Sequence, residues 1–291
     1  MAVCDSSAPQ TPQHSLWFEG GGNFADIESS ALARHYTLEG GIANVGLDYS
    51  VSTVVTLGMS AGYQGAEADL QGDLGTIGLD GGGVTIYGLF ESANTGLYFQ
   101  GMAGLFGNEY HLTRNFLLNG FGFRSARGET SGVQFNTQGS VGWERSWQGW
   151  AFGLEAGLHY SGLHIQSFTE RGAFPFDVAY ASQTGESFQS AINAEFSKII
   201  PLGEHQLMAH VSGGWRHEFL DQDHSLQGGF AAGFGTPFNV TTPSFGKDFA
   251  EAGGGVTVWL NDRTSLSGQY DAQLGDGFTA HLLTARLRWL W

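Results

Sequence analysis

Acidic and histidine side chains gather in one stretch of the sequence, where they could act as acids, bases or metal ligands. His217, Glu218, Asp221, Asp223 and His224 follow one another closely in a segment predicted to be a long loop. Loop carboxylates and histidines can share a hydrolytic water, so a hydrolase or a loose cation site is one interpretation. The spacing His-x-x-x-His of zinc sites is absent, and the sequence favours a solvated acidic loop. No catalytic, cofactor-binding or metal-binding residue is predicted.

A second candidate is Ser60, because Gly58-Met59-Ser60-Ala61-Gly62 matches the pattern of a nucleophile elbow. That elbow requires a sharp turn from a strand into a helix. Here apolar residues alternate with small or polar ones straight through the motif, which predicts the inside of a strand. Ser60 is therefore not expected to act as a nucleophile, and the chain is predicted not to be an enzyme.

The elements that position these side chains are strands, as the last ten residues show. One face of residues 282–291 is apolar and ends in Trp289 and Trp291, whereas the other carries Arg286 and Arg288. A period of two residues defines a strand. Tryptophan suits a membrane interface, and arginine needs water or a carboxylate. This pattern is typical of the final strand of an outer-membrane barrel.

The same alternation recurs from Ser15 onward and is interrupted at regular intervals by turns. Short turns are expected at 50–53, 93–96, 148–149, 201–204 and 261–263, and long polar loops at 24–36, 67–79, 114–129, 169–183, 218–246 and 272–277. Short turns alternating with long loops are typical of membrane barrels, and about twelve strands are expected. All six prolines are expected to lie outside the strands, where a missing N–H does no harm.

Composition agrees with such a barrel and excludes other classes. The 291 residues include 46 glycines and only 14% charged residues, and the mean hydropathy is -0.12. No apolar run approaches the roughly 20 residues of a spanning helix, so a spanning chain must be a closed barrel. A net charge of -16 argues against nucleic acid as a partner. The single cysteine, Cys4, excludes an internal disulfide.

The alternation also predicts which face meets lipid. Tryptophan, phenylalanine and tyrosine near strand ends would form an outward aromatic girdle. Charged side chains on the other face could brace the barrel wall or contact a chain inside the lumen, and the sequence favours bracing. The residues expected to face the lumen are Glu19, Glu91, Glu144, Glu155, Glu195, His159, His210, Arg216, Arg286 and Arg288.

Three motifs in order resemble the translocator domain of monomeric autotransporters, the type V secretion proteins. These motifs are Leu16-Trp17-Phe18-Glu19-Gly20-Gly21 in the first strand, Trp215-Arg216-His217-Glu218-Phe219 before a long loop, and Leu274-Gly275-Asp276-Gly277 to the terminal Arg288-Trp289-Leu290-Trp291. The resemblance covers residues 15–291. It implies an all-β, transmembrane antiparallel barrel in the cell outer membrane that helps export an N-terminal passenger in cis.

The resemblance also implies partners and departs from the family in one respect. Its terminal strand would be read by the barrel-assembly machinery, so Trp289 and Trp291 are expected to serve as an assembly signal, as interface anchors, or as both. A monomer bound by outer-membrane lipid, without cofactors, is expected. Residues 1–14 are expected to be an unstructured remnant or linker, since they hold two prolines and no signal peptide.

The family's linker helix and passenger are therefore expected to be missing from this piece of a longer protein. Two alternatives stay open. One is a small porin-like channel with an unplugged lumen. The other is a surface protease built on Asp221, Asp223 and His224.

Overall fold

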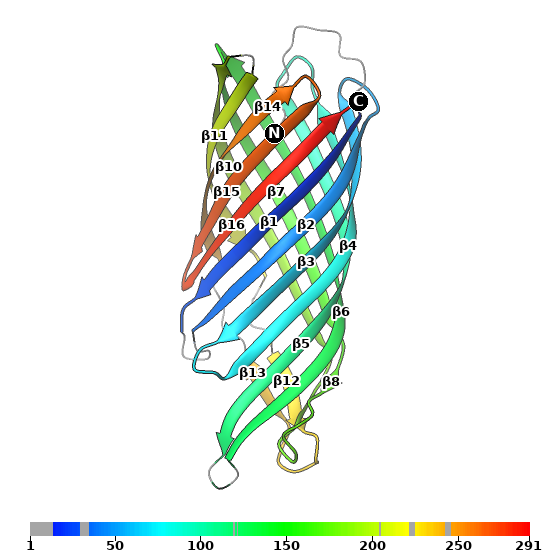
Figure 1. The fold of residues 1–291 in the computed structure, drawn as a ribbon, viewed down its shortest axis with the longest axis vertical. Helices are drawn as coiled ribbons and strands as arrows, with labels where there is room; N and C mark the ends of the chain where they lie inside the picture. Colours follow the sequence, from blue (N-terminus) through cyan, green and yellow to red (C-terminus); the bar gives the residue numbers. More distant parts are fainter. Residues whose placement is uncertain are drawn as a thin grey trace.

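The protein forms a closed antiparallel barrel of twelve strands, which confirms the predicted fold class (Figure 1). The computed structural model describes residues 14–29, 35–118, 120, 122–203, 205–220, 225–241 and 246–291. Each barrel strand pairs with the next barrel strand along the chain, and the first pairs with the last. The barrel strands are β1 (His14–Ile27), β2 (Tyr36–Ser50), β3 (Val55–Leu70), β4 (Gly75–Glu91), β5 (Leu97–Leu118), β6 (Gly122–Trp147), β7 (Trp150–Ile165), β10 (Gln183–Leu202), β11 (His205–Glu218), β14 (Asp248–Asn261), β15 (Thr264–Gly275) and β16 (Phe278–Leu290).

A tight turn joins two strands at the end of the barrel that carries both termini. At the end that carries both termini, β6 and β7 are joined by Gln148 and Gly149 alone, both with positive φ. Two consecutive positive φ values make the tight turn that matches the twist of paired strands. Residues 1–13 of the expected N-terminal remnant lie outside the described residues, and its last residue, His14, already belongs to β1.

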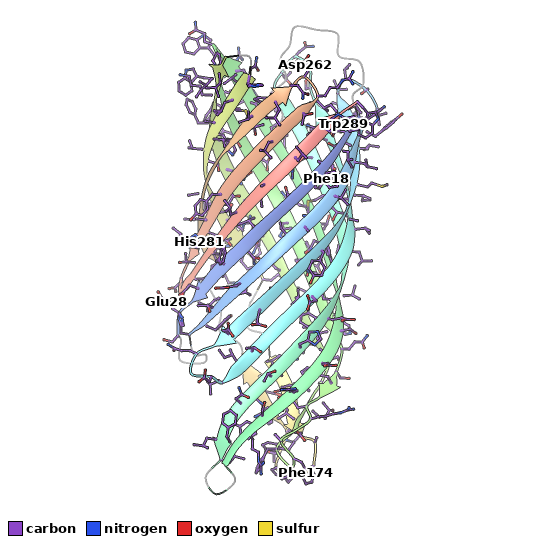
Figure 2. All side chains as sticks on the ribbon, viewed as in Figure 1. Phe18, Glu28, Phe174, Asp262, His281 and Trp289 are labelled. Atoms are coloured by element: carbon purple, nitrogen blue, oxygen red, sulfur yellow. The ribbon has the colours of Figure 1, made fainter. Side chains whose placement is uncertain are left out.

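The outer surface of the barrel wall is apolar across its middle. The register places Val45, Ala61, Val84, Leu105 and Phe135 side by side on five neighbouring strands. Val84 is 60% exposed and Leu105 is 53% exposed. Phe18 and Trp289 lie on the same outer surface of the seam strands (Figure 2). An exposed apolar belt around a closed barrel faces lipid.

Aromatic side chains mark the limit of this belt at the end away from the termini. Each is tied by its polar tip to a titratable group on the neighbouring strand, with the ring on the belt side. Such amphipathic rings belong at a membrane–water boundary. The pairs in this outer rim are Tyr63 with Asp80, Tyr160 with Glu186, Trp215 with Asp248, and Tyr270 with His281.

Beyond the outer rim the strands continue, which corrects three of the expected loops. β5 has 22 residues and β6 has 26, against 14 in β1. The segments expected as loops at 67–79, 114–129 and 272–277 are therefore mostly strand in the described chain, with turns at 71–74, at Gly120 and at 276–277. Beyond the membrane the outward face of a strand meets water and no longer has to be apolar, so the pattern that reveals a membrane strand is lost.

A second, four-stranded sheet covers part of this extension. Its strands are β8 (Phe168–Thr169), β9 (Val178–Tyr180), β12 (Ser225–Phe230) and β13 (Phe238–Thr241), in the order β13-β12-β9-β8. A backbone bridge between Arg127 and Arg171 joins it to β6. Phe176 packs edge-on against Phe230 and Phe234 beneath it. We call this unit the outer sheet; it lies at the end of the molecule opposite the termini (Figure 1).

One proline lies inside a strand, contrary to expectation. Pro201 pairs with Gln206 near the end of β10. On its other side β7 begins only at Trp150, opposite Lys198, so no strand there requires a hydrogen bond from position 201. In the part of the chain that the structure describes, no helix is long and apolar enough to cross a membrane, a finding that concerns helices only.

Candidate functional site

Polar side chains from separate strands meet in the interior of the barrel. A cavity of about 820 Å³ lies inside it. Glu155, Glu195 and Arg216, three of the residues expected to face the lumen, line this cavity. The others are placed below by their contacts.

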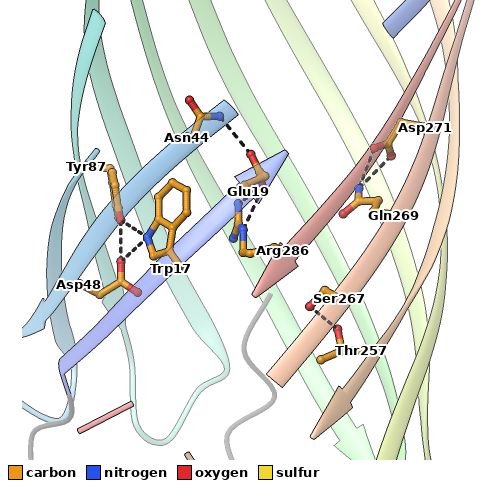
Figure 3. Close-up of polar contacts among 10 residues, drawn as sticks. All are labelled: Trp17, Glu19, Asn44, Asp48, Tyr87, Thr257, Ser267, Gln269, Asp271 and Arg286. Carbon is orange, nitrogen blue, oxygen red and sulfur yellow. Dashed lines mark hydrogen bonds and ion pairs between the residues drawn. The ribbon is translucent and has the colours of Figure 1, made fainter. Parts of the chain in front are cut away.

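Glu19 and Arg286 form an ion pair across the seam between β1 and β16. Both Nε and Nη2 of Arg286 donate to Oε2 of Glu19, at 2.9 and 2.6 Å, and Asn44 donates to the other carboxylate oxygen (Figure 3). The guanidinium also lies over the ring of Trp17, 4.8 Å from its centroid. A charged pair joined by two hydrogen bonds to one carboxylate oxygen stabilises the pairing of the first strand with the last.

Asp48 is the centre of a second cluster on the same strands. Its Oδ1 accepts hydrogen bonds from Tyr87 Oη at 2.6 Å and from Trp17 Nε1 at 3.3 Å (Figure 3). Its Oδ2 accepts from Arg288 Nη2 at 3.1 Å and from Ser15. Trp17 and Tyr87 belong to β1 and β4, so this contact reaches across two intervening strands and requires the concave face of the wall.

Asp48, Tyr87 and Trp17 were missed by the sequence-based selection of lumen residues. Trp17 stands two residues before Glu19 and therefore shares its face, which is the signal that could have identified it. Glycines make room for these rings. A Cβ at Gly46 would fall 2.3 Å from the Trp17 ring, and one at Gly58 would fall 2.1 Å from the Tyr87 ring.

Arg216 is engaged on β11 in a third cluster. Its Nη2 lies 2.7 Å from Glu251 Oε1 on β14, and its Nη1 donates to Gln189 on β10 at 3.0 Å. Both expected histidines lie near these strands. Nδ1 of His159 and Nδ1 of His210 are buried without a hydrogen-bond partner, and neither ring forms an ion pair among the described residues.

The remaining expected residues are carboxylates on β4, β6, β7 and β10. Glu155 accepts hydrogen bonds from Tyr98 Oη at 2.8 Å and Gln100 Nε2 at 2.9 Å. Glu144 and Glu195 stand on either side of Gly153 of β7, which pairs with both. Within the described ranges none of these four carboxylates has a lysine or arginine partner, in contrast to Glu19 and Asp48.

The residues considered for hydrolysis are only partly described. Asp221, Asp223 and His224 lie outside the described residues. His217 lies 2.9 Å from Asp248 and stacks on Trp215 at the outer rim. The side chain of Glu218 is fully buried and accepts hydrogen bonds from Ser187, Gln189 and two backbone N–H groups, so its oxygens are already used. The described part of the chain holds no group of side chains suited to a metal ion.

The structure also gives the positions of Ser60 and of the two terminal tryptophans. Ser60 lies inside β3, paired with Gly46 and Thr85, and not at a strand-to-helix turn. Trp291 donates its backbone N–H to the carbonyl of His14 at 3.0 Å, which extends the seam by one residue beyond β16. Its ring lies 5.4 Å from that of Trp289, centroid to centroid.

Comparison with known proteins gives a family and a set of similar barrels. A family model described as the autotransporter β-domain matches residues 16–271. The translocator domain of the autotransporter NalP from Neisseria meningitidis is 13% identical with a TM-score of 0.77, over 98% of this chain and 90% of that one. The β-domain of the Bordetella autotransporter BrkA is 18% identical with a TM-score of 0.68, over 96% and 99%.

The transport unit of the autotransporter AIDA-I from Escherichia coli is a third similar structure. It is 15% identical with a TM-score of 0.61, over 98% of this chain and 92% of that one. At these identities the solved structures show a shared fold alone. No curated protein matched in sequence.

Proposed function

Because the chain belongs to the autotransporter β-domain family, we propose that it anchors an N-terminal passenger in the outer membrane and helps deliver it to the cell surface. The observation that carries this proposal is the coincidence of the family match with a closed barrel whose interior holds ion pairs. Barrels of this family are outer-membrane translocators, and the apolar belt and outer rim suit that location.

The position of the first strand supports a path for the passenger. β1 begins at the same end of the barrel as the C-terminus (Figure 1). Any polypeptide joined before His14 therefore meets the barrel at this end, which we assign to the periplasm. The outer sheet and the long strand extensions then lie on the cell surface, where the passenger is released.

The lumen side chains are proposed to brace the wall. Ion pairs such as Glu19–Arg286 and Arg216–Glu251 join neighbouring strands and hold the polar interior open. The barrel is proposed to act as a monomer without catalytic activity of its own. Trp289 and Trp291 are proposed to be read by the barrel-assembly machinery while also anchoring the seam in the membrane interface.

Surface display of a reporter tests the function. A signal peptide, an epitope-tagged reporter and a linker would be fused before His14, and the fusion expressed in a Gram-negative host. Antibody labelling of intact cells, removed by external protease, is the expected result. A matched fusion that ends before β16 cannot close the barrel and should leave the epitope inside. Epitope found only after permeabilisation, with the barrel assembled, would contradict translocation.

The porin-like alternative makes a different prediction in the same cells. A dedicated channel would raise the uptake of small solutes and give no display of the reporter. The comparisons do not support the porin-like channel better than they support the translocator.

A further inference from the structure

Two basic side chains lie on the outward surface of the barrel wall, at the end that carries the termini. Arg145 on β6 stands opposite Phe152 of β7, and Lys198 on β10 stands opposite Trp150 of β7. Residues directly opposite one another share a face of the sheet, and the exposed ring of Phe152 identifies this face as the outward one. Because β7 lies between β6 and β10, both cations border one strand. We call Arg145, Trp150 and Lys198 the cationic site.

The cationic site lies at the membrane boundary opposite the outer rim. Trp150 and Tyr160 share the outward face of β7 and are ten residues apart in the sequence. For a strand tilted by about 40°, ten residues correspond to about 25 Å along the membrane normal, the height of the apolar band of a membrane barrel. On β6 the indole N–H of Trp143 donates to the carbonyl of Thr95 at 3.1 Å, in the turn at this end. A tryptophan with its polar edge turned toward a barrel end is typical of a membrane interface.

Neither cation has a carboxylate partner among the described residues, whereas the arginines of the lumen each pair with a carboxylate. Nζ of Lys198 lies 4.2 Å from the centroid of the Trp150 ring. An ammonium group over an aromatic face still has N–H groups free to donate to an anion. Arg145 is exposed, and within the described ranges it makes no hydrogen bond or ion pair. Both side chains are therefore available to a ligand.

The position of these two charges is unusual for this barrel. Within the residues that the structure describes, no other lysine or arginine occupies an outward strand position in this half of the barrel. The corresponding positions hold apolar or aromatic side chains, for instance Tyr49, Phe90, Leu260 and Trp289. A cation on the lipid-facing surface is unfavourable at the middle of a membrane and tolerated near its boundary, where a flexible side chain can carry the charge to the headgroups.

The surroundings indicate what kind of anion fits. The backbones of β6 and β10 are two strand spacings apart, about 9.6 Å, so flexible guanidinium and ammonium groups can converge on one phosphate between them. The Trp150 ring packs against Phe196, with 4.9 Å between the centroids, and the exposed side chains of Phe152 and Leu154 continue this surface into the apolar belt. Basic groups beside such a surface suit a ligand that joins a phosphate to hydrocarbon chains.

We propose that the cationic site binds the headgroup phosphate of an anionic phospholipid, in the leaflet at the end of the barrel that carries the termini. The chain as a whole has a net charge of -16, so this preference depends on the local pair of cations. A zwitterionic phospholipid carries its own positive charge beside the phosphate and is bound more weakly. The site lies outside the lumen, so the proposal holds or fails independently of passenger export.

Lipid titration of the purified barrel tests the proposal. Barrel refolded in neutral detergent would be titrated with phosphatidylglycerol, and the bound lipid counted by native mass spectrometry. The variant Arg145→Gln, Lys198→Gln should need about tenfold more lipid for half-occupancy, because two charge contacts to the phosphate are lost. Arg145→Gln alone should give an intermediate loss. Phosphatidylcholine should bind weakly and equally to all forms, and heat-dependent gel mobility verifies that each variant is folded.

The matched control is Arg124→Gln, Arg127→Gln, which changes the net charge equally on the part of β6 beyond the outer rim. The control should bind phosphatidylglycerol as the parent does. Equal affinity in the parent and in the variant of the cationic site would overturn the proposal. Displacement of the lipid by an equal concentration of inorganic phosphate would identify a free-anion site and overturn it too. A dimer of the parent that the variant loses would assign the surface to a second copy instead.

Discussion

Glu170 shows how a single charged residue organises the structure above the outer rim. Its carboxylate is fully buried and accepts hydrogen bonds from both Nε and Nη2 of Arg114, at 2.9 and 2.5 Å. The backbone N–H of Val178 and the hydroxyl of Tyr180 complete its environment. The hydrogen bond to Glu170 raises the pKa of Arg114, and burial raises the pKa of Tyr180 to about 12. The outer sheet is thus fastened to β5 by one ion pair.

Replacing Glu170 by glutamine should release the outer sheet. The substitution leaves Arg114 without its counter-charge, and removing one partner of a buried pair costs about 3 kcal/mol. Amide hydrogen exchange of Val178–Tyr180 should accelerate while the barrel strands stay protected. Glu186→Gln, which alters a pair exposed at the rim, is the control and should change little. Unchanged exchange in Glu170→Gln would show that the ion pair does not hold the sheet.

At the scale of the strand, closure depends on β1 and β16. Their register runs from Ser15 opposite Leu290 to Ile27 opposite Phe278, and Glu19 faces Arg286 within it. Glu19→Arg should lower the temperature at which the folded barrel opens, because two arginines would face each other at the seam. The loss should be about 1 kcal/mol, since Arg286 is partly exposed.

The exchanged pair, Glu19→Arg with Arg286→Glu, tests the cause of that loss. It restores opposite charges at the same two positions and should recover most of the stability in a thermal unfolding series followed by gel mobility. A double variant no more stable than Glu19→Arg would mean that the side chains act through packing, for instance against Trp17, and not through their charges.

The boundary of the membrane can be tested on one strand. Ser131 and Phe135 share the outer face of β6, but Ser131 lies in the row of Asp80 and Glu109, above the belt, and Phe135 lies in it. With Cys4 replaced by serine, Ser131→Cys in lipid vesicles should react with a charged thiol reagent and Phe135→Cys should not. Equal labelling of both would place the boundary elsewhere.

The strands that cross the belt could be predicted from sequence, and those above it could not. In 55–63 the apolar residues alternate strictly, because one face meets lipid and the other meets the lumen. In 114–129 charged and polar residues occupy both faces, and in 67–79 Glu67 and Asp69 take the outward face in place of apolar residues, so the same backbone structure was predicted as loop. The outer sheet was missed for this reason as well.

For the residues of the lumen, too, one part of the structure could be predicted from the sequence and another could not. The two-residue period predicts a face for each charged residue, and in the structure Glu19 and Arg286 form an ion pair. Which residues pair could not be predicted, because partners such as Trp17 and Tyr87 are separated by 70 positions in the chain. Only the barrel's closure and shear bring such strands within reach.

At the scale of the whole molecule, a deletion of Trp291 can distinguish an effect on assembly in the cell from an effect on the stability of the finished barrel. Its backbone adds one hydrogen-bonded pair to the seam, and its side chain packs on Trp289. Deleting Trp291 should reduce barrel in the outer membrane several-fold while leaving refolding into detergent nearly intact, if the residue is read during assembly. Fractionation and refolding yield measure the two effects. Equal loss in both would make Trp291 a structural anchor only.

The central claim is that the chain closes into a membrane-spanning barrel around a polar lumen. The most direct test is gel mobility before and after boiling, combined with circular dichroism, on protein refolded into detergent or lipid. A β-rich spectrum and a compact species that migrates faster until it is boiled are the expected results. A protein that folds as a monodisperse species in plain buffer, with no heat-dependent change in mobility, would contradict the account.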